Sequence, residues 1–412
     1  MEVDVNSVSA IQPAAHKKRA LLGALVQRAQ EFLPVLREAA PKHEVDRRVS
    51  ADVMDALNEA GLLDLMKPAR FGGHELGPSA VVRVCYELGR GDGSTAWCAM
   101  VTSISAWFVS YWDLQAQKDI WEDKPNALVC GVFVPTGKCE VVEGGYNVSG
   151  RWPFASSCEN SDWVYVSAMV ENPETKDVGP GLFLIPMSSL QVDQSSWHVA
   201  GLAGSGSKTV YTDEPVFVPS HRMVRYNDIH NGMAPGQQIA DNPLANFWFS
   251  TFGASGLISP LLGMAQGALD WFTEAMQAKA RIPMRPGAPI SAAANPFTQQ
   301  KAGFASAAID SALALVLGDL EAAEAKIFSG ETLTQDERVK MRRNFGFCTQ
   351  QARAAVDALM AASGASASEL DKPIQRFWRD LNAGARHVSL DIDGINMAVG
   401  QNRFGLPVTG PY

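Results

Sequence analysis

The chain has few features that would mark it as a secreted, metal-binding or nucleic-acid-binding protein. Its six cysteines stand apart in the sequence, and none forms a CxxC pair or lies at metal-ligand spacing from a histidine. We therefore expect buried free thiols in a reducing cytoplasm and no metal site. Lysine and arginine form no cluster and the net charge is −9, which argues against a nucleic-acid partner.

A membrane-targeting segment is also missing from the sequence. The longest apolar runs, such as LISPLLGMAQGAL, are shorter than a bilayer span and contain proline and glycine. The first residues, MEVDVNSVSAIQPAAHKK, lack a basic segment followed by an apolar one, so no secretory signal is predicted. We expect a cytoplasmic protein without a membrane partner.

What the chain does have is a hydrophobic period that changes twice along its 412 residues. Residues 1–125 have the spacing of helices, residues 126–235 have short alternating runs typical of strands, and residues 236–412 return to helical spacing. The pattern predicts a mainly α fold with a central antiparallel β domain and a C-terminal four-helix bundle. The bundle helices are expected at about 245–279, 299–328, 333–362 and 373–398.

Turn residues subdivide this pattern. EGGY, near residue 144, is a hairpin signal, and Gly150 is expected to close a hairpin. The polar connector at 227–243 is either a lid or a linker, and the proline-rich break at 281–296 leaves the same choice open.

Two segments of the β domain could hold a flat, polar-edged ring. SGRWPFASS places Phe154 beside Ser156 and Ser157, so an aromatic face stands next to hydroxyl groups. GLAGSGS, which contains Ser205, could present backbone N–H groups to a polar ligand edge. An ordinary sandwich core with serine-rich turns explains both segments equally well.

His387 is the candidate acid–base residue. It follows Asp380 by seven residues on the predicted last helix, which would place both on one face. An imidazole with an ordinary pKa near about 6.5 suits proton exchange at neutral pH. The alternative is a half-buried core histidine.

Four segments, in order, resemble the acyl-CoA dehydrogenase superfamily of flavoproteins, and the likeness covers nearly the whole chain. They are ALNEAGLLDLMKPARFGG, RWPFASSCENSDWVYVSA, GLAGSGSKTVYTDEPVFVP and PIQRFWRDLNAGARH. The resemblance implies that Phe154 lies against the flavin ring and Ser156 near its N5 edge, with Ser157 and Ser205 beside them. It also implies that Arg281 and Gln300 reach a flavin phosphate in a neighbouring subunit of a homotetramer built as a dimer of dimers.

One departure from the dehydrogenases bears on the chemistry. In one of their subgroups a catalytic carboxylate follows the RD pair, and here that position falls on Val388. The usual adenine-contacting GGxGY is replaced by ASGASAS. The chain is more similar to the two-component flavin-dependent monooxygenases that hydroxylate p-hydroxyphenylacetate, phenols, indoles or thiophenes, which carry a histidine at the position of His387.

That second resemblance implies reduced flavin (FADH2 or FMNH2), supplied by a separate NAD(P)H:flavin reductase, and O2. A C4a-hydroperoxide would transfer one oxygen atom to an aromatic or heteroaromatic small molecule. Where many of these oxygenases carry a second catalytic histidine, this chain has Ser105. Because a hydroxyl is a poor base, an indole-like ring is expected to fit better than a phenol that must ionise.

Candidate residues for contacting the substrate come from the N-terminal helices and the first bundle helix. They are Trp107, Phe247, Trp248, Phe249 and Phe252. Two other functions stay open: an acyl-CoA or nitroalkane-type dehydrogenase or oxidase with an unrecognised base, and a non-catalytic scaffold that has lost its flavin.

Overall fold

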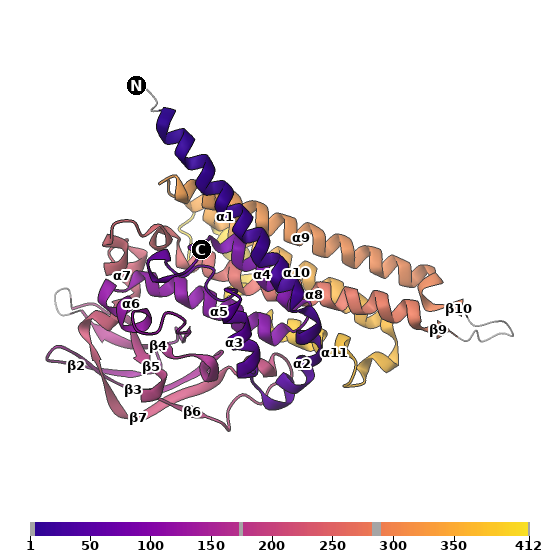
Figure 1. Ribbon diagram of the computed structural model, residues 1–412, viewed down its shortest axis with the longest axis horizontal. Helices are drawn as coiled ribbons and strands as arrows, with labels where there is room; N and C mark the ends of the chain where they lie inside the picture. Colours follow the sequence, from indigo (N-terminus) through magenta and orange to yellow (C-terminus); the bar gives the residue numbers. More distant parts are fainter. Residues whose placement is uncertain (1–4, 173–175, 282–289, 411–412) are drawn as a thin grey trace.

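The computed structural model describes residues 5–172, 176–281 and 290–410, and has an N-terminal helical part, two β-sheets and a C-terminal set of long helices (Figure 1). This is the architecture that the change of period predicts. The N-terminal helices are α1 (Val5–Glu31), α2 (Leu33–Asp46), α3 (Ala51–Glu59), α4 (Pro78–Gly89), α5 (Gly93–Phe108) and α6 (Leu114–Trp121).

Helix α5 lies at the centre of the molecule. It starts at Gly93 because the carboxylate of Asp92 accepts hydrogen bonds from the N–H groups of Ser94 and Thr95. Every residue of α5 is buried except Val101, which is partly exposed and packs against both hydrophobic cores. The helix therefore connects the helical core with the core between the sheets.

The β part consists of two four-stranded sheets. One has the order β1 (Val129–Gly131), β4 (Trp163–Glu171), β5 (Val178–Pro186) and β8 (Met223–Arg225); the other has the order β2 (Lys138–Val142), β3 (Gly145–Ala155), β7 (Lys208–Pro219) and β6 (Gln191–Asp193). Pairing is antiparallel except between β1 and β4, which are parallel.

The hairpin predicted from EGGY is present, with Gly144 in the left-handed region at φ 79° between β2 and β3. The prediction that Gly150 closes a hairpin is wrong. Gly150 lies inside β3 at a register shift against β7, where a Cβ atom would come within 2.8 Å of Gly137 Cα. Glycine is needed there for close backbone approach, not for a turn.

The C-terminal helices are α8 (Phe249–Ala278), α9 (Pro296–Phe328), α10 (Gln335–Ser363), α11 (Pro373–Gly384) and α12 (Ile392–Arg403), and a short β9 (Ala280–Arg281) and β10 (Ile290–Ser291) lie between the first two. The prediction of one continuous last helix is wrong, and His387 does not share a helical face with Asp380. Helix α11 ends at Gly384, and side chains then cap the backbone: His387 Nδ1 accepts from the Ser389 N–H, and Asp391 accepts from the Gly394 N–H.

By length and mean hydropathy, α9 could cross a bilayer, and 39% of its most apolar window is buried. The apolar runs of the sequence did not indicate this, because polar residues such as Asp310 and Asp319 interrupt them. The connector at 227–243 includes α7 (Tyr226–His230) and packs on the end of α5, where Asn242 donates to the Ser110 carbonyl at 3.0 Å. Its role as a lid stays a prediction, and residues 282–289 of the second break lie outside the described part.

Candidate active site

Three serine hydroxyls meet where strands β3 and β7 separate. The two strands pair Ala155 with Lys208, so the next residues on either side, Ser156 and Ser207, are neighbours. Their hydroxyl oxygens are 2.6 Å apart, and Ser207 Oγ is 2.8 Å from Ser205 Oγ. The two serine-rich segments singled out in the sequence thus form one row of hydroxyls.

The backbone around this row has several non-glycine residues in the left-handed region. Phe154, Ser157, Trp197 and Leu202 are non-glycine residues with φ between 55° and 67°. Such residues are rare and cluster at functional sites, where the surrounding structure holds them in place. Phe154 is 66% exposed and meets the Trp197 ring edge-to-face at 6.0 Å, which leaves an aromatic face open beside the serines.

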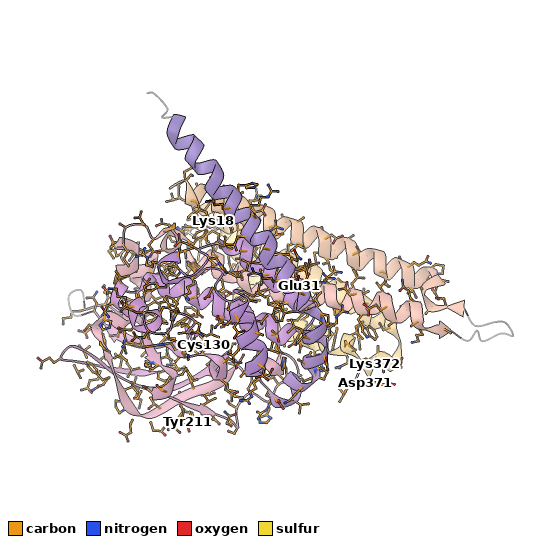
Figure 2. The ribbon with its side chains drawn as sticks, in the orientation of Figure 1. Lys18, Glu31, Cys130, Tyr211, Asp371 and Lys372 are labelled. Atoms are coloured by element: carbon orange, nitrogen blue, oxygen red, sulfur yellow. The ribbon has the colours of Figure 1, made fainter. Side chains whose placement is uncertain are left out.

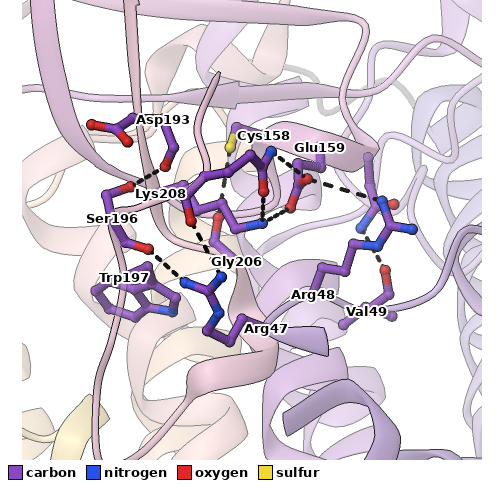
Figure 3. Close-up of polar contacts among 12 residues, drawn as sticks. Arg47, Arg48, Val49, Cys158, Glu159, Asp193, Ser196, Trp197, Gly206 and Lys208 are labelled. Carbon is purple, nitrogen blue, oxygen red and sulfur yellow. Dashed lines mark hydrogen bonds and ion pairs between the residues drawn. The ribbon is translucent and has the colours of Figure 1, made fainter. Parts of the chain in front are cut away.

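Side chains from the α2 end of the N-terminal part support this region (Figure 3). Arg47 donates to the Ser196 carbonyl at 2.9 Å and so holds the segment that carries Trp197. Lys208 is buried, with an ion pair to Glu159. The base of the serine row is therefore held by Arg47, which bonds backbone carbonyls, and by the Lys208–Glu159 ion pair.

Helix α5 and the turn after α11 complete the site. The indole N–H of Trp97 donates to Ser156 Oγ at 3.2 Å. The ring of His387 lies 6.4 Å from the Trp97 ring, centroid to centroid. Close packing brings them together: a Cβ on Gly384 would lie 3.0 Å from the Trp97 ring and 3.2 Å from Leu202 Cδ1. Trp97, Ser156 and His387 thus come from three separate parts of the chain.

His387 is exposed, with protein atoms around part of its ring. These displace bulk water and lower the pKa of the imidazole to about 4, and the Arg342 guanidinium acts in the same direction. The imidazole is therefore neutral at physiological pH. Because Nδ1 accepts the Ser389 N–H at 3.2 Å, the neutral ring carries its proton on Nε2.

Beyond Val101, the same face of α5 reaches an aromatic cluster of Phe108, Phe133, Tyr165 and Phe249. Phe249 lies 4.4 Å from Phe108 and 4.7 Å from Phe133 between ring centroids, and Phe133 and Phe249 are partly exposed. Ser105, buried beneath, has its hydroxyl 3.3 Å from the Tyr165 hydroxyl. Exposed aromatic faces with two hydroxyls behind them suit a small polar-edged ring.

The other proposed substrate residues lie apart from this cluster or behind it. Trp107 is buried against Phe249, with ring centroids 5.8 Å apart. Phe247 and Phe252 pack on each other, and Trp248 stacks under Arg338. Phe247, Trp248 and Phe249 all line one cavity of about 280 Å³. Phe249 is thus the proposed aromatic that is partly exposed and also contacts the Phe108 and Phe133 rings.

Arg281 and Gln300 lie far from the serine row within one chain. Arg281 ends β9 and Gln300 is exposed in the first turns of α9, both at the tip of the α8–α9 pair that points away from the sheets (Figure 1). Their contribution to a neighbouring subunit's site stays a prediction.

Three contributing residues were missed in the sequence, Trp97, Ser207 and Tyr165. Ser207 belongs to the GSGS run, so its alternation with Ser205 could have indicated it. Tyr165 lies in a strand that reads as ordinary core. The carboxylate position of the dehydrogenases is Val388, which is 80% exposed, and Asp391 next along the turn is occupied in capping α12.

Comparison with known families matches two models to the chain. The N-terminal domain of acyl-CoA dehydrogenase matches residues 19–124, and the C-terminal domain of acyl-CoA dehydrogenase matches residues 255–392. The unmatched middle contains the sheets and the serine row.

Relatives with assigned activities cover almost the whole chain. The oxygenase component of FADH(2)-dependent resorcinol hydroxylase from Rhizobium sp. (strain MTP-10005) is 33% identical, covering 97% of this chain and 98% of its own. The oxygenase subunit HsaA of a flavin-dependent monooxygenase from Rhodococcus jostii (strain RHA1) is also 33% identical, covering 93% and 99%.

Solved structures agree with this assignment. The 3-HSA hydroxylase from Rhodococcus sp. RHA1 superposes with a TM-score of 0.87 at 31% identity, covering 94% of this chain and 98% of that one. XiaF from Streptomyces sp., in complex with FADH2 and glycerol, also gives 0.87, at 25% identity over 97% and 99%. The chain belongs to the oxygenase components of the flavin-dependent monooxygenases, enzymes built on the acyl-CoA dehydrogenase fold.

Proposed function

We propose that this oxygenase component hydroxylates a small phenolic ring, using O2 and reduced flavin delivered by a separate NAD(P)H:flavin reductase. The observation that carries the proposal is the meeting of Trp97, Ser156 and His387 from three parts of the chain, with valine at the position of the dehydrogenase carboxylate. The site thus offers an imidazole N–H donor and not a carboxylate that would remove a substrate proton.

The residues present suit a flavin. The serine row offers hydroxyls to the polar edge of an isoalloxazine, and the exposed face of Phe154 offers a stacking surface. Among the described residues, the buried Ser157 hydroxyl has no nitrogen or oxygen partner, which an added polar group would satisfy. When bound, reduced flavin supplies the two electrons that activate O2.

The protein's own contribution is a donor held in a fixed position. His387 presents an Nε2–H from a ring whose other nitrogen is held by the Ser389 N–H. The Arg342 side chain donates to the Ser389 carbonyl at 2.6 Å and so fixes the same turn. Trp97, which is 7% exposed, packs beside it on the α5 side. A positioned donor favours oxygen transfer over release of peroxide.

Ser105 and Tyr165 would bind the substrate hydroxyl. Eight residues separate Trp97 from Ser105, a distance of about 12 Å along α5, which leaves room for a small ring between them. Both hydroxyls can donate or accept, so a neutral phenol can be recognised without being ionised. The 33% identical resorcinol hydroxylase favours a phenol, while indole-3-acetate monooxygenase is 27% identical.

We further propose FADH2 as the flavin, a cytoplasmic location and a homotetramer. The FADH(2)-dependent relative and the FADH2 complex of XiaF support the first, and six free cysteines support the second. The tetramer is supported by α9, whose exposed face carries small residues such as Ala307, Ala314 and Gly318 next to the exposed Phe304.

Aerobic turnover with a general flavin reductase and a panel of phenols, indoles and thiophenes tests the function. We expect a hydroxylated phenol, and for His387→Ala a loss of product with a rise in released peroxide. His16→Ala, at an exposed position on α1, serves as the control. Purification as a yellow protein that oxidises an acyl-CoA thioester without a reductase would instead identify a dehydrogenase.

A further inference from the structure

The loop that carries the serine row is held from outside the β part by helix α11. The carboxylate of Asp380, only 3% exposed, accepts a hydrogen bond from the Leu202 N–H at 2.6 Å. Leu202 has a left-handed backbone at φ 55° and precedes Ser205 by three residues. A buried carboxylate thus fixes a strained residue at the start of the serine segment.

Two neighbouring contacts reinforce this one. A Cβ on Gly201 would lie 2.3 Å from the Arg379 carbonyl oxygen, so the loop backbone lies directly against α11. The Arg379 guanidinium donates to the Ala200 carbonyl at 2.6 Å. Residues 200, 201 and 202 are therefore each tied to one turn of the helix.

The histidine lies in the turn that follows the same helix. His387 follows the end of α11 at Gly384 by three residues, and Gly384 packs on both Trp97 and Leu202. The bond from Asp380 therefore sets the position of the serine row relative to His387, although Asp380 itself makes no contact with either.

The surroundings of Asp380 make its charge costly. Burial is the main cause that raises the pKa of this carboxyl to about 7, and the negative charges of Asp92 and Glu44 raise it as well. The hydrogen bond from Leu202 and the Arg379 guanidinium act in the opposite direction and lower it. The remaining groups nearby act mainly on Asp92: His43 Nδ1 lies 2.8 Å from it, and the buried Arg376 is a further cation.

We propose that Asp380 is a positioning residue that clamps the serine-bearing loop to the helix preceding His387, and that the clamp is tightest when its carboxyl takes up a proton. A protonated carboxyl keeps a carbonyl oxygen that accepts the Leu202 N–H, and it no longer repels Asp92 and Glu44. If the loop opens, solvent returns the carboxyl to its ordinary pKa of 3.8. The closed form therefore binds the proton more tightly, and closure strengthens as pH falls through 7.

Hydrogen–deuterium exchange at the amides of residues 202–207, corrected for the intrinsic pH dependence, tests the clamp in the free protein. Protection should be about tenfold higher at pH 6 than at pH 8. Between these values the closed form changes from largely protonated to largely ionised, while the open form stays ionised. Asp380→Asn keeps an acceptor and removes the charge, so it should show high protection at both pH values. Asp380→Ala should lose protection at both.

Asp371→Asn is the matched control, because Asp371 lies at the surface beside Lys372, just before α11 (Figure 2). It should behave as the unmodified protein. Protection in Asp380→Asn that still falls from pH 6 to pH 8 as in the unmodified protein would overturn the proposal.

The consequence for the enzyme rests on the proposed function and is measured separately. Anaerobic titration with FADH2 should give a dissociation constant several-fold lower at pH 6 than at pH 8, and Asp380→Asn should remove this difference. A clamp that tightens in the exchange experiment while FADH2 affinity stays constant would overturn its role at the site. The exchange result does not depend on flavin, so it stands apart from any failure of the proposed function.

Discussion

The Trp97 indole N–H and the Ser156 hydroxyl, 3.2 Å apart, join a helix of the N-terminal part to the end of a β-strand. Ser156 is in turn bonded to Ser207, so the indole orients the first hydroxyl of the row. This contact forms only when α5 and the sheet are packed together, and it links the folding of two parts of the chain to the shape of the site.

Replacing Trp97 by phenylalanine should weaken the binding of reduced flavin. The ring is largely kept, while one hydrogen bond to Ser156 is lost, which costs about 0.5–1.5 kcal/mol, or about 2- to 12-fold in affinity. Anaerobic fluorescence titration measures the change. Trp121→Phe is the control, because its indole donates to the Ala127 carbonyl at 3.1 Å outside the site. Equal affinities for the two variants would contradict the assigned role.

Replacing Arg342 by methionine should raise the pKa of His387. Burial and the Arg342 charge both hold the pKa of the imidazole below its ordinary value, and the variant removes the second cause. NMR titration of the ring, assigned with His387→Gln, follows the shift. Arg343→Met is the control, since Arg343 bonds Asn344 instead.

The lowered pKa of His387 also makes the stability of the folded protein depend on pH. The unfolded chain takes up this proton near pH 6.5 and the folded chain only near pH 4, so the folded state loses stability as pH falls through that range. Solvent reaching the exposed ring reduces the size of the effect. His387→Gln should make acid unfolding less steep between these values, as followed by circular dichroism; an unchanged profile would place the imidazole in bulk solvent.

Removing the Ser105 hydroxyl should affect substrate binding more than flavin binding. For Ser105→Ala we expect the KM for a phenol to rise about fivefold, the equivalent of one neutral hydrogen bond, with an unchanged dissociation constant for reduced flavin. Tyr165→Phe should have a similar effect, because the two hydroxyls are 3.3 Å apart. A KM for the corresponding methyl ether that changes as much as that for the phenol would argue against recognition of the hydroxyl.

Adding a methyl group to Gly201 should disturb the serine loop. The new Cβ would lie 2.3 Å from the Arg379 carbonyl, and relieving that overlap should cost about 1–3 kcal/mol and weaken flavin binding. Gly23→Ala is the control: nothing lies within 4 Å of its Cβ position, and an alanine inside a helix should stabilise it slightly. Thermal unfolding of both variants gives the comparison.

The order of the three parts was predictable because hydrophobic period follows directly from helix and strand geometry. The same reasoning misplaced the end of the last helix. The segment from Ala385 to Asp391 has helical composition, and only the capping by His387 and Asp391 side chains shows the break. Capping competes with helix continuation locally, and the period of apolar residues does not record it.

The sequence by itself determined the architecture, the serine-rich segments and the histidine beside a valine where the dehydrogenases have a carboxylate. The tertiary structure decided which of these meet. Ser156 and Ser207 are 51 residues apart and become neighbours through strand pairing, and Asp380 reaches Leu202 across 178 residues. Contacts between such distant residues depend on strand register and on the docking of helices, and the local pattern of side chains determines neither of these.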